Sequence, residues 1–475
     1  MSYINRNSLR DEFNNIKSEF VELSKNNKLS KESKVLFRSM FALFEIVLAI
    51  FLERTTKKDS KNSSKPSSQT EKDESSEIES GSKSKGKIEN NQQFINSHDQ
   101  ETITISPVVF CENCGEDLTD TENIKYERRT KIDIIFTKVI EHVDAEVKIC
   151  TNCQKINIGK FPKDFLGKLQ YGLGIKAYIL DLVIAQMISL NRIQKSINTL
   201  IGRMISESII LKYVRQLYES LEEWEKTNID QILKVSAINA DETSLRVNKK
   251  NYWVHVYSSG DITLKFLHTK RGKEAIEDIN IIPRYGGVVI HDCWASYLSY
   301  NHCRHGLCGS HLLRELTFIF DSNRYKWAIN MKRLLQETCK KVSKSTKKSL
   351  NDKDYYNLQK RYRNILTRGQ KELPEIVKKQ TGKRGKIAKS DAHNLWERLS
   401  NYEQAVLLFA KEPAVSFTNN RAERDLRMGK VKQKVSGCFR TEFFAKCYCR
   451  ISSYLQTMSN KGYNPLVAIE LALTK

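Results

Sequence analysis

The apolar pattern changes its period near residue 235, and this change restricts the fold more than any other feature of the chain. Three segments, "VSAINADET", "NYWVHVYSS" and "DITLKFLHT", alternate or run apolar over short stretches, and turn-forming residues separate them. Such segments predict β-strands that follow one another as an antiparallel meander. A helix-like segment, "RGKEAIEDINII", then precedes a fourth strand-like run, "GGVVIHDCW".

Three meandering strands, a helix and a fourth strand are the element order of the RNase H-like fold. At 475 residues the chain has room for about three domains. We therefore expect an α+β multidomain protein with an RNase H-like domain over residues 233–450. The pattern is helical again from residue 310, which predicts a helical insertion at about 322–410. Part of it, 340–389, is strongly basic, with 17 Lys or Arg against 4 Asp or Glu.

The rest of the chain divides by composition. Residues 1–56 contain the apolar run "VLFRSMFALFEIVLAIFL", interrupted by Arg38 and Glu45. We expect a coiled-coil-like helical arm that pairs with another helix, including one of a second subunit; a membrane anchor is the less favoured alternative because two charges would lie in the span.

Three further segments complete the division. Residues 57–106 are rich in Ser, Lys and Glu, as in a flexible low-complexity linker. Residues 161–232 are helical, and two short helices around Gly202 are compatible with a helix-turn-helix DNA reader or with an ordinary helical hairpin. A helical tail is expected over 451–475.

Eleven cysteines in one chain favour metal binding or free thiols over disulfides in a reducing compartment. Four of them form two Cys-x-x-Cys pairs, "CENC" and "CTNC", and such knuckles together make a tetrahedral thiolate site for one structural Zn²⁺. The predicted ligands are Cys111, Cys114, Cys150 and Cys153. The stretch between the pairs alternates as a β-hairpin would, so we expect a zinc ribbon with a long arm over 107–160.

Two aspartates lie at the ends of strand-like segments, Asp241 on the first and Asp292 on the fourth. If these strands pair, the carboxylates lie side by side and require cations between them, and Mg²⁺ prefers oxygen ligands. Glu423, one turn into a helix, supplies a third carboxylate for two ions about 3.5–4 Å apart. One ion would activate the attacking oxygen and the other would stabilise the leaving oxygen. Taken alone, each Asp is more simply a turn or cap residue.

The stretch around Glu423, "FTNNRAERDLRMGK", is strongly cationic. The net charge of +23 suits a polyphosphate partner. Asn419 and Asn420 fit a helix start at which Asn caps free backbone amides, and the lysines from 430 to 434 alternate as an extended strip would. A solvated charged face is the alternative. The predicted DNA-binding residues are Arg421, Arg424, Arg427, Lys430, Lys432 and Lys434.

The segments "NADETSLRV", "VVIHDCWASYLSY", "LCGSHLLREL" and "TNNRAERDLRMGKVKQKVSGCFRT" resemble the insertion-sequence-66 family of DDE transposases. The resemblance implies Asp241, Asp292 and Glu423 as a catalytic triad, a helical insertion within the catalytic domain and a zinc-binding domain before it. It also implies a Cys-x-x-His at Cys308 and His311 close to the catalytic edge. We expect these two to support the site by hydrogen bonding or packing; the alternative is a metal site completed by His302, Cys303 and His305.

The expected function is that of a DNA transposase that cleaves and transfers strands at the ends of an insertion sequence by two-metal phosphoryl transfer. Its partners would be element ends, target DNA, further copies of the chain as a homo-oligomer, and other proteins of the same element, with no membrane. We expect it in the bacterial cytoplasm, associated with the nucleoid. The alternatives are a catalytically inactive or repurposed zinc-ribbon DNA-binding protein and a metal-dependent nuclease without strand transfer.

Overall fold

The computed structural model describes residues 6–26, 29–56, 58–59, 61–63, 103–131, 137–163, 165, 167–376 and 389–474. Most of the predicted linker 57–106 and residues 377–388 of the predicted insertion lie outside the described residues. The described part is α+β, as the sequence predicts. It divides into two compact units: the first is Met1–Gly86 with Glu222–Gln456, and the second is Lys87–Leu221 with Thr457–Lys475.

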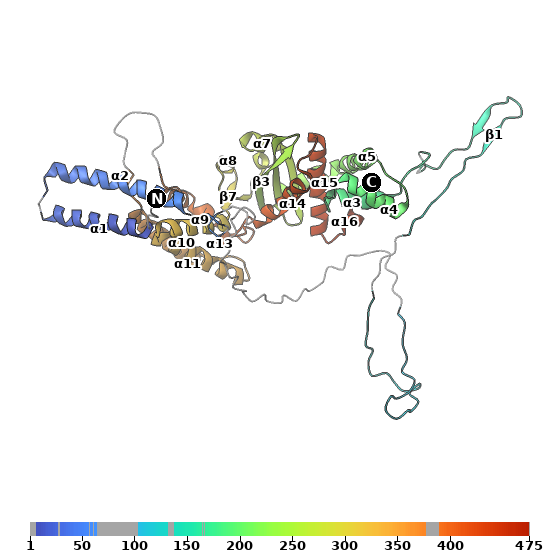
Figure 1. Ribbon diagram of the computed structural model, residues 1–475, viewed down its shortest axis with the longest axis horizontal. Helices are drawn as coiled ribbons and strands as arrows, with labels where there is room; N and C mark the ends of the chain where they lie inside the picture. Colours follow the sequence, from blue (N-terminus) through green and yellow to red (C-terminus); the bar gives the residue numbers. More distant parts are fainter. Residues whose placement is uncertain are drawn as a thin grey trace. The chain divides into compact units, whose positions relative to one another are not determined.

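The first unit is built on a five-stranded mixed sheet (Figure 1), with the strand order β5-β4-β3-β6-β7. Its strands are β3 (Ala237–Val247), β4 (Lys250–Ser259), β5 (Ile262–His268), β6 (Val288–His291) and β7 (Arg304–Leu307). The first three form the predicted antiparallel meander. Asn248 and Lys249 both have positive φ, as the tight turn of a two-residue hairpin requires. The helix α7 (Lys273–Ile279) then precedes β6, which runs parallel to β3 and to β7.

Both faces of this sheet are buried. Alternate residues of a strand point to opposite sides, so each strand contributes side chains to both cores. On one face, Ala237, Ile290 and Leu307 join a core made with five helices. These helices are α9 (Gly309–Asn323), α10 (Lys326–Lys344), α11 (Asp352–Glu372), α12 (Asp391–Asn401) and α13 (Glu403–Lys411). On the other face, Ile238 and Val289 pack with α7 and with α6 (Glu222–Ile232) and α8 (Ala295–Leu298). Two more helices, α14 (Asn420–Ser436) and α15 (Glu442–Asn460), follow; α14 packs on β3 and β4.

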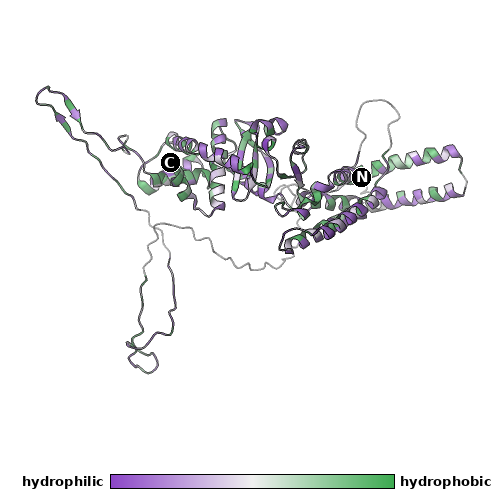
Figure 2. Cartoon of the chain, turned by 180° about the vertical axis from the view of Figure 1, so that it is seen from behind, coloured by the Kyte–Doolittle hydropathy of each residue, from purple (hydrophilic) through white to green (hydrophobic). Residues whose placement is uncertain are grey.

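The N-terminal arm is a helical hairpin of α1 (Arg6–Lys25) and α2 (Lys31–Thr55) (Figure 1). The predicted helix is therefore confirmed, and the helix it pairs with is α1: the Phe20 ring lies 5.7 Å from Phe37 and 5.1 Å from Phe41 between centroids. Figure 2 shows apolar residues along α2, and several of them are exposed. By length and composition alone, α2 is the one described helix long and apolar enough to cross a membrane.

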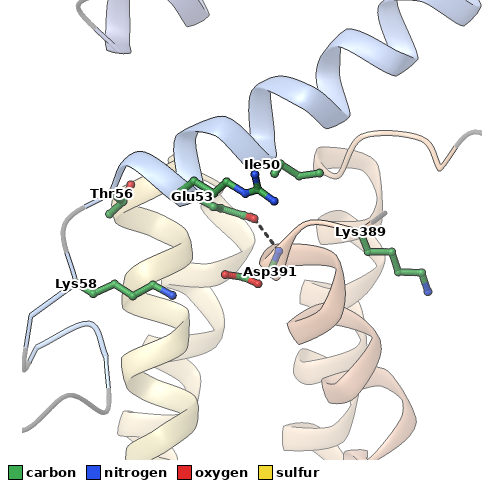
Figure 3. A pocket seen from close by; sticks show the side chains of 7 residues that line it. Ile50, Glu53, Thr56, Lys58, Lys389 and Asp391 are labelled. Atoms are coloured by element: carbon green, nitrogen blue, oxygen red, sulfur yellow. Dashed lines mark hydrogen bonds between the residues drawn. The ribbon is translucent and has the colours of Figure 1, made fainter. Parts of the chain in front are cut away.

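The last turns of α2 are fixed by the buried Glu53 (Figure 3). Its carboxylate accepts hydrogen bonds from the backbone amides of Asp391 at 2.7 Å and Ala392 at 3.1 Å, the first residues of α12. A third bond comes from Asn323 Nδ2 at 2.9 Å. Burial raises the pKa of the Glu53 carboxyl, and these donors oppose that increase. A carboxylate at a helix N-terminus is stabilised by the helix dipole, so Glu53 ties the arm to the core of the first unit.

The second unit contains four helices and a short strand pair within its described residues. The helices are α3 (Leu173–Ile184), α4 (Leu190–Ile201), α5 (Glu207–Ser220) and α16 (Pro465–Leu473). The predicted pair of helices around Gly202 is confirmed: α4 ends at Gly202, whose φ of 70° suits glycine, and α5 begins five residues later.

The predicted long β-arm between the cysteine pairs is wrong for its described residues. Residues 137–146 form no strand. Instead β1 (Val147–Ile149) pairs with β2 (Ile156–Ile158) across the second cysteine pair. The tight turn at Cys150–Cys153 reverses the chain direction between β1 and β2, so the hairpin forms around the second cysteine pair and not along the predicted arm.

Candidate active site

Two of the three predicted carboxylates are brought together by the pairing of β3 with β6. Their parallel register sets Asn239 opposite Ile290, and two residues further it brings Asp241 beside Asp292. β6 ends at His291, so Asp292 follows a strand end as predicted. The prediction that Asp241 ends a strand is wrong: β3 continues to Val247 because β4 pairs with it beyond the end of β6.

The third carboxylate, Glu423, lies in the first turn of α14, as predicted. The pKa of the Asp241 carboxyl is raised to about 8, chiefly by burial and also by the charges of Glu242, Asp292 and Glu423, while a hydrogen bond from the Glu242 backbone amide opposes the increase. Asp292 and Glu423 thus lie near enough to Asp241 for their charges to act on its carboxyl, although in the described part of the chain these three side chains do not form as compact a group as Cys308, His311 and Glu423 do. A cation among them removes this repulsion, and three carboxylates are the oxygen-only donor set that suits Mg²⁺.

Strand alternation turns Glu242 away from this cluster. Its Oε2 accepts a hydrogen bond from the buried Tyr297 hydroxyl at 2.7 Å, and its Oε1 accepts one from Arg271 Nε at 2.8 Å. The Arg271 guanidinium in turn lies 4.4 Å from the centre of the Trp294 ring. Sequence reasoning missed this group, since nothing local marks Arg271, 29 residues from Glu242, as its partner. Strand alternation thus separates the two neighbouring acids: Asp241 faces α14, whereas the Glu242 carboxylate is paired with Arg271 and Tyr297 on the opposite face.

Asn419 holds α14 against the sheet. Its side-chain Nδ2 donates to the Ala240 carbonyl at 2.8 Å, its Oδ1 accepts from Asn239 Nδ2 at 2.9 Å, and its backbone amide donates to Cys308 Sγ at 3.1 Å. The prediction that Asn419 caps free helix amides is wrong, since its side chain makes no cap hydrogen bond. The Asn419 side chain is buried and both its nitrogen and its oxygen bond to β3, whereas Asn420 is exposed.

Cys308 and His311 lie beside Glu423. Cys308 follows β7 and precedes α9, and His311 is in the first turn of α9. The ligand atoms of Cys308, His311 and Glu423 all lie within 4.8 Å of one another. Burial lowers the pKa of the His311 imidazole, and Arg314 lowers it further, while Glu423 and Asp292 oppose the decrease.

The alternative in which His302, Cys303 and His305 complete a metal site with Cys308 and His311 is wrong. His302 Nε2 contacts the Ile282 carbonyl at 3.0 Å, and His305 Nε2 contacts the Tyr300 carbonyl at 3.0 Å. Cys303 also bonds to Tyr300. These residues lie at the start of β7, whereas Cys308 follows its other end.

The six predicted DNA-binding residues fall into two groups. Arg424, Arg427 and Lys434 are exposed, and the other three are partly buried. Lys430 Nζ donates to Ser244 Oγ at 2.9 Å, and burial lowers the pKa of Lys430 and of Lys432. The predicted extended strip is wrong, because α14 continues to Ser436 and the lysines from 430 to 434 are helical. Their alternation therefore directs them to different sides of a helix.

Each cysteine pair closes the same kind of turn. The Gly115 amide donates to the Cys111 carbonyl, and the Gln154 amide donates to the Cys150 carbonyl, both at 2.9 Å. Backbone amides within each turn also donate to the first sulfur and lower the pKa of Cys111 and Cys150. Among the described residues, however, the four thiols are not gathered into one cluster; the one compact group of metal-binding side chains is Cys308, His311 and Glu423.

We expect Asn419→Ala to lower the free energy of unfolding of the first unit by about 2–3 kcal/mol, because it leaves the buried Asn239 amide and the Ala240 carbonyl without their partner. All five tryptophans lie in this unit, so their fluorescence during urea unfolding measures its stability. The exposed neighbour is the control: Asn420→Ala should change the free energy by less than about 0.5 kcal/mol. Equal effects of the two substitutions would contradict the role given to Asn419.

Comparison with known proteins adds one match. The family profile described as Transposase IS66 family covers residues 168–447, more than half of the chain. No curated protein matches the chain. The matched range contains β3, β6, the start of α9 and all of α14, and so every carboxylate of the cluster. The chain belongs to the IS66 family of transposases.

Proposed function

We propose that this transposase is a Mg²⁺-dependent DDE enzyme, which cleaves DNA at the ends of an insertion sequence and joins the freed strand to target DNA. The observation that supports the proposal is that Asp292, after β6, and Glu423 of α14 lie near enough to Asp241 of β3 for their charges to act on its carboxyl. The strand order supports an RNase H-like catalytic domain over 233–450, since an antiparallel meander is followed by two parallel strands. In this reading α10 to α13 are the helical insertion at about 322–410.

The three carboxylates would hold two Mg²⁺ ions. When bound, the ions supply Lewis acidity for in-line phosphoryl transfer by water or by a 3′ hydroxyl. The chain's own residues fix the geometry: the register of β3 and β6 sets Asp241 against Asp292, and Asn419 orients the helix that carries Glu423. Positioning of this kind counts because small displacements of reacting groups cost large factors in rate.

The catalytic prediction concerns the three carboxylates one at a time. Asp241→Asn, Asp292→Asn and Glu423→Gln should each lower Mg²⁺-dependent cleavage by roughly a thousandfold or more, about 4 kcal/mol in the barrier. The assay uses supercoiled DNA that carries the sequences flanking the gene. DNA binding in a gel-shift assay should persist in all three.

The control is Glu274→Gln, which removes an exposed carboxylate of α7 in the same unit and should leave cleavage unchanged. Normal cleavage by any of the three triad variants would refute the assignment. Cleavage by the unsubstituted protein without any joined product would make it a nuclease instead.

DNA would run along the exposed side of α14. Guanidinium groups suit phosphate oxygens, and Arg424 and Arg427 are exposed within two turns of Glu423. The helices α4 and α5 are the proposed helix-turn-helix reader of 161–232. The partly buried Lys430 and Lys432 contribute to the positive potential of this side more than to direct contact.

We expect Arg424→Ala/Arg427→Ala to weaken binding to any DNA sequence. The slope of log affinity against log salt should become smaller by about one for each phosphate that the variant no longer neutralises. Arg333→Ala/Arg368→Ala is the matched control, because it removes the same charge from exposed positions of α10 and α11. If both pairs change affinity and slope equally, the effect is one of net charge and α14 makes no particular contact.

Cys111, Cys114, Cys150 and Cys153 would hold one structural Zn²⁺ in a ribbon over 107–160. The support is the repeated turn, which presents the paired thiols of each Cys-x-x-Cys as zinc knuckles do. Binding of the ion would draw the two turns together, and its binding free energy would stabilise this segment.

The purified Cys111→Ser variant should therefore contain one equivalent of zinc less than the unsubstituted protein, as measured by elemental analysis. Hydrogen exchange within 107–160 should become faster, because the segment loses the ion that orders it. Cys339→Ser, in α10, removes a thiol outside the ribbon and should change neither measurement. Unchanged zinc content in the Cys111 variant would exclude the ribbon site.

A further inference from the structure

Two polar atoms face each other near the triad without hydrogen-bond partners. In the described part of the chain, His311 Nδ1 and Glu423 Oε1 are both buried and both lack one. They lie 3.6 Å apart, within the range of an ion pair when the imidazole is protonated but too far apart for a hydrogen bond. Buried polar atoms are nearly always paired, and an unpaired one costs about 1–3 kcal/mol. Two such atoms directed at one point indicate that something else binds there.

A third donor, Cys308 Sγ, lies at the same point. The Cys308 side chain is buried at 1% exposure, and its sulfur is within 4.8 Å of the other two ligand atoms. Ligand atoms of a tetrahedral zinc site are about 3.3–3.8 Å apart, given bond lengths of about 2.0–2.3 Å. Small side-chain rotations would therefore bring all three atoms to bonding distance.

The backbone holds these donors in place. Cys308 ends the connection from β7, His311 lies in the first turn of α9, and Glu423 lies in the first turn of α14. The two helix starts are tied together, since the Gly309 amide donates to the Phe417 carbonyl at 2.7 Å. A Cβ on Gly309 would lie 2.2 Å from the Phe417 ring, so only glycine permits this close approach.

We propose that Cys308, His311 and Glu423 bind one divalent transition-metal ion of the zinc class. Sulfur and imidazole donors select zinc or cobalt over magnesium, which prefers oxygen alone. Three protein ligands leave a fourth position for water or another oxygen donor, as in zinc sites that act on a substrate. Zinc binding by Cys308, His311 and Glu423 can be tested without the proposed cleavage. The role of the bound ion rests on the proposed function, because Glu423 is shared with the magnesium triad.

The test measures bound zinc on the full chain. Reduced protein is equilibrated with Zn²⁺, desalted and analysed for metal. Cys308→Ser and His311→Gln should each hold one equivalent less than the unsubstituted protein. Cys303→Ser, which removes a buried thiol outside the cluster, should hold the full amount. A zinc ribbon contributes equally to every sample, so its presence or absence does not change these differences.

The triad variants separate this site from the proposed cleavage. Glu423→Gln should lose the equivalent, whereas Asp241→Asn should retain it while losing cleavage. A protein that cleaves no DNA yet shows the same differences in zinc would refute the proposed function and keep the metal site. Equal zinc content in the unsubstituted protein, Cys308→Ser and His311→Gln would overturn the metal site alone.

If the two cluster variants do not fold, as tryptophan fluorescence would show, the unsubstituted protein decides. X-ray absorption of the zinc-loaded chain should show nitrogen or oxygen neighbours at about 2.0–2.1 Å beside sulfur at about 2.3 Å. A shell of sulfur alone would mean that zinc occupies only cysteine sites, and the proposal would be wrong.

Discussion

The parallel pairing of β3 with β6 is the constraint on which the site depends. Both strands are buried on two faces, and their register fixes which side chains reach which face. A slip of β3 by one residue would exchange the faces of its side chains. Glu242 would then face α14, and Asp241 would meet Tyr297. The apolar residues Ile238 and Ala240 would be displaced from their core by the same slip, so packing and the placement of the acids are enforced together.

This pairing holds two carboxylates near each other against their repulsion, and helix contacts then add the third. The pKa of Asp241 is raised to about 8 by burial and by its acidic neighbours, which reflects the free-energy cost of keeping its carboxylate ionised at this place. Asn419 fixes α14 to β3 through its amide, and the close contact of Gly309 with Phe417 fixes α9 to the segment before α14. Neither contact involves a charged group, so the framework does not depend on the ionisation of the acids it positions.

Local sequence pattern predicts the elements of this site better than their contacts. The strands from Ala237 to His268, the short helix α7, the helix start before Glu423 and the adjacency of Asp241 and Asp292 all follow from period and order. The strand β7, with the sequence "RHGL", is too short and too polar at its start to be recognised. The bonds of Asn419 to Asn239 and Ala240 cross 180 and 179 residues, respectively, and are invisible to local pattern. The prediction of an extended strip for the lysines from 430 to 434 is wrong because alternation is typical of a strand. Their conformation is set instead by the packing of the helix α14 against β3 and β4.

Glu423 belongs to two donor sets of different chemistry. With Asp241 and Asp292 it offers only oxygen, which suits magnesium; with Cys308 and His311 it completes a set that suits zinc. The two sets would therefore select different ions from one solution. A cation held by Cys308 and His311 would also place positive charge beside the triad, and such a charge favours the ionised form of nearby carboxylates. The electrostatic repulsion that contributes to the raised pKa of Asp241 would then be reduced by a cation whose ligands Cys308 and His311 lie at the start of α9 and not on the sheet. In this arrangement Cys308 and His311, at the start of α9, would affect Asp241 and Asp292 through Glu423, which belongs to both donor sets.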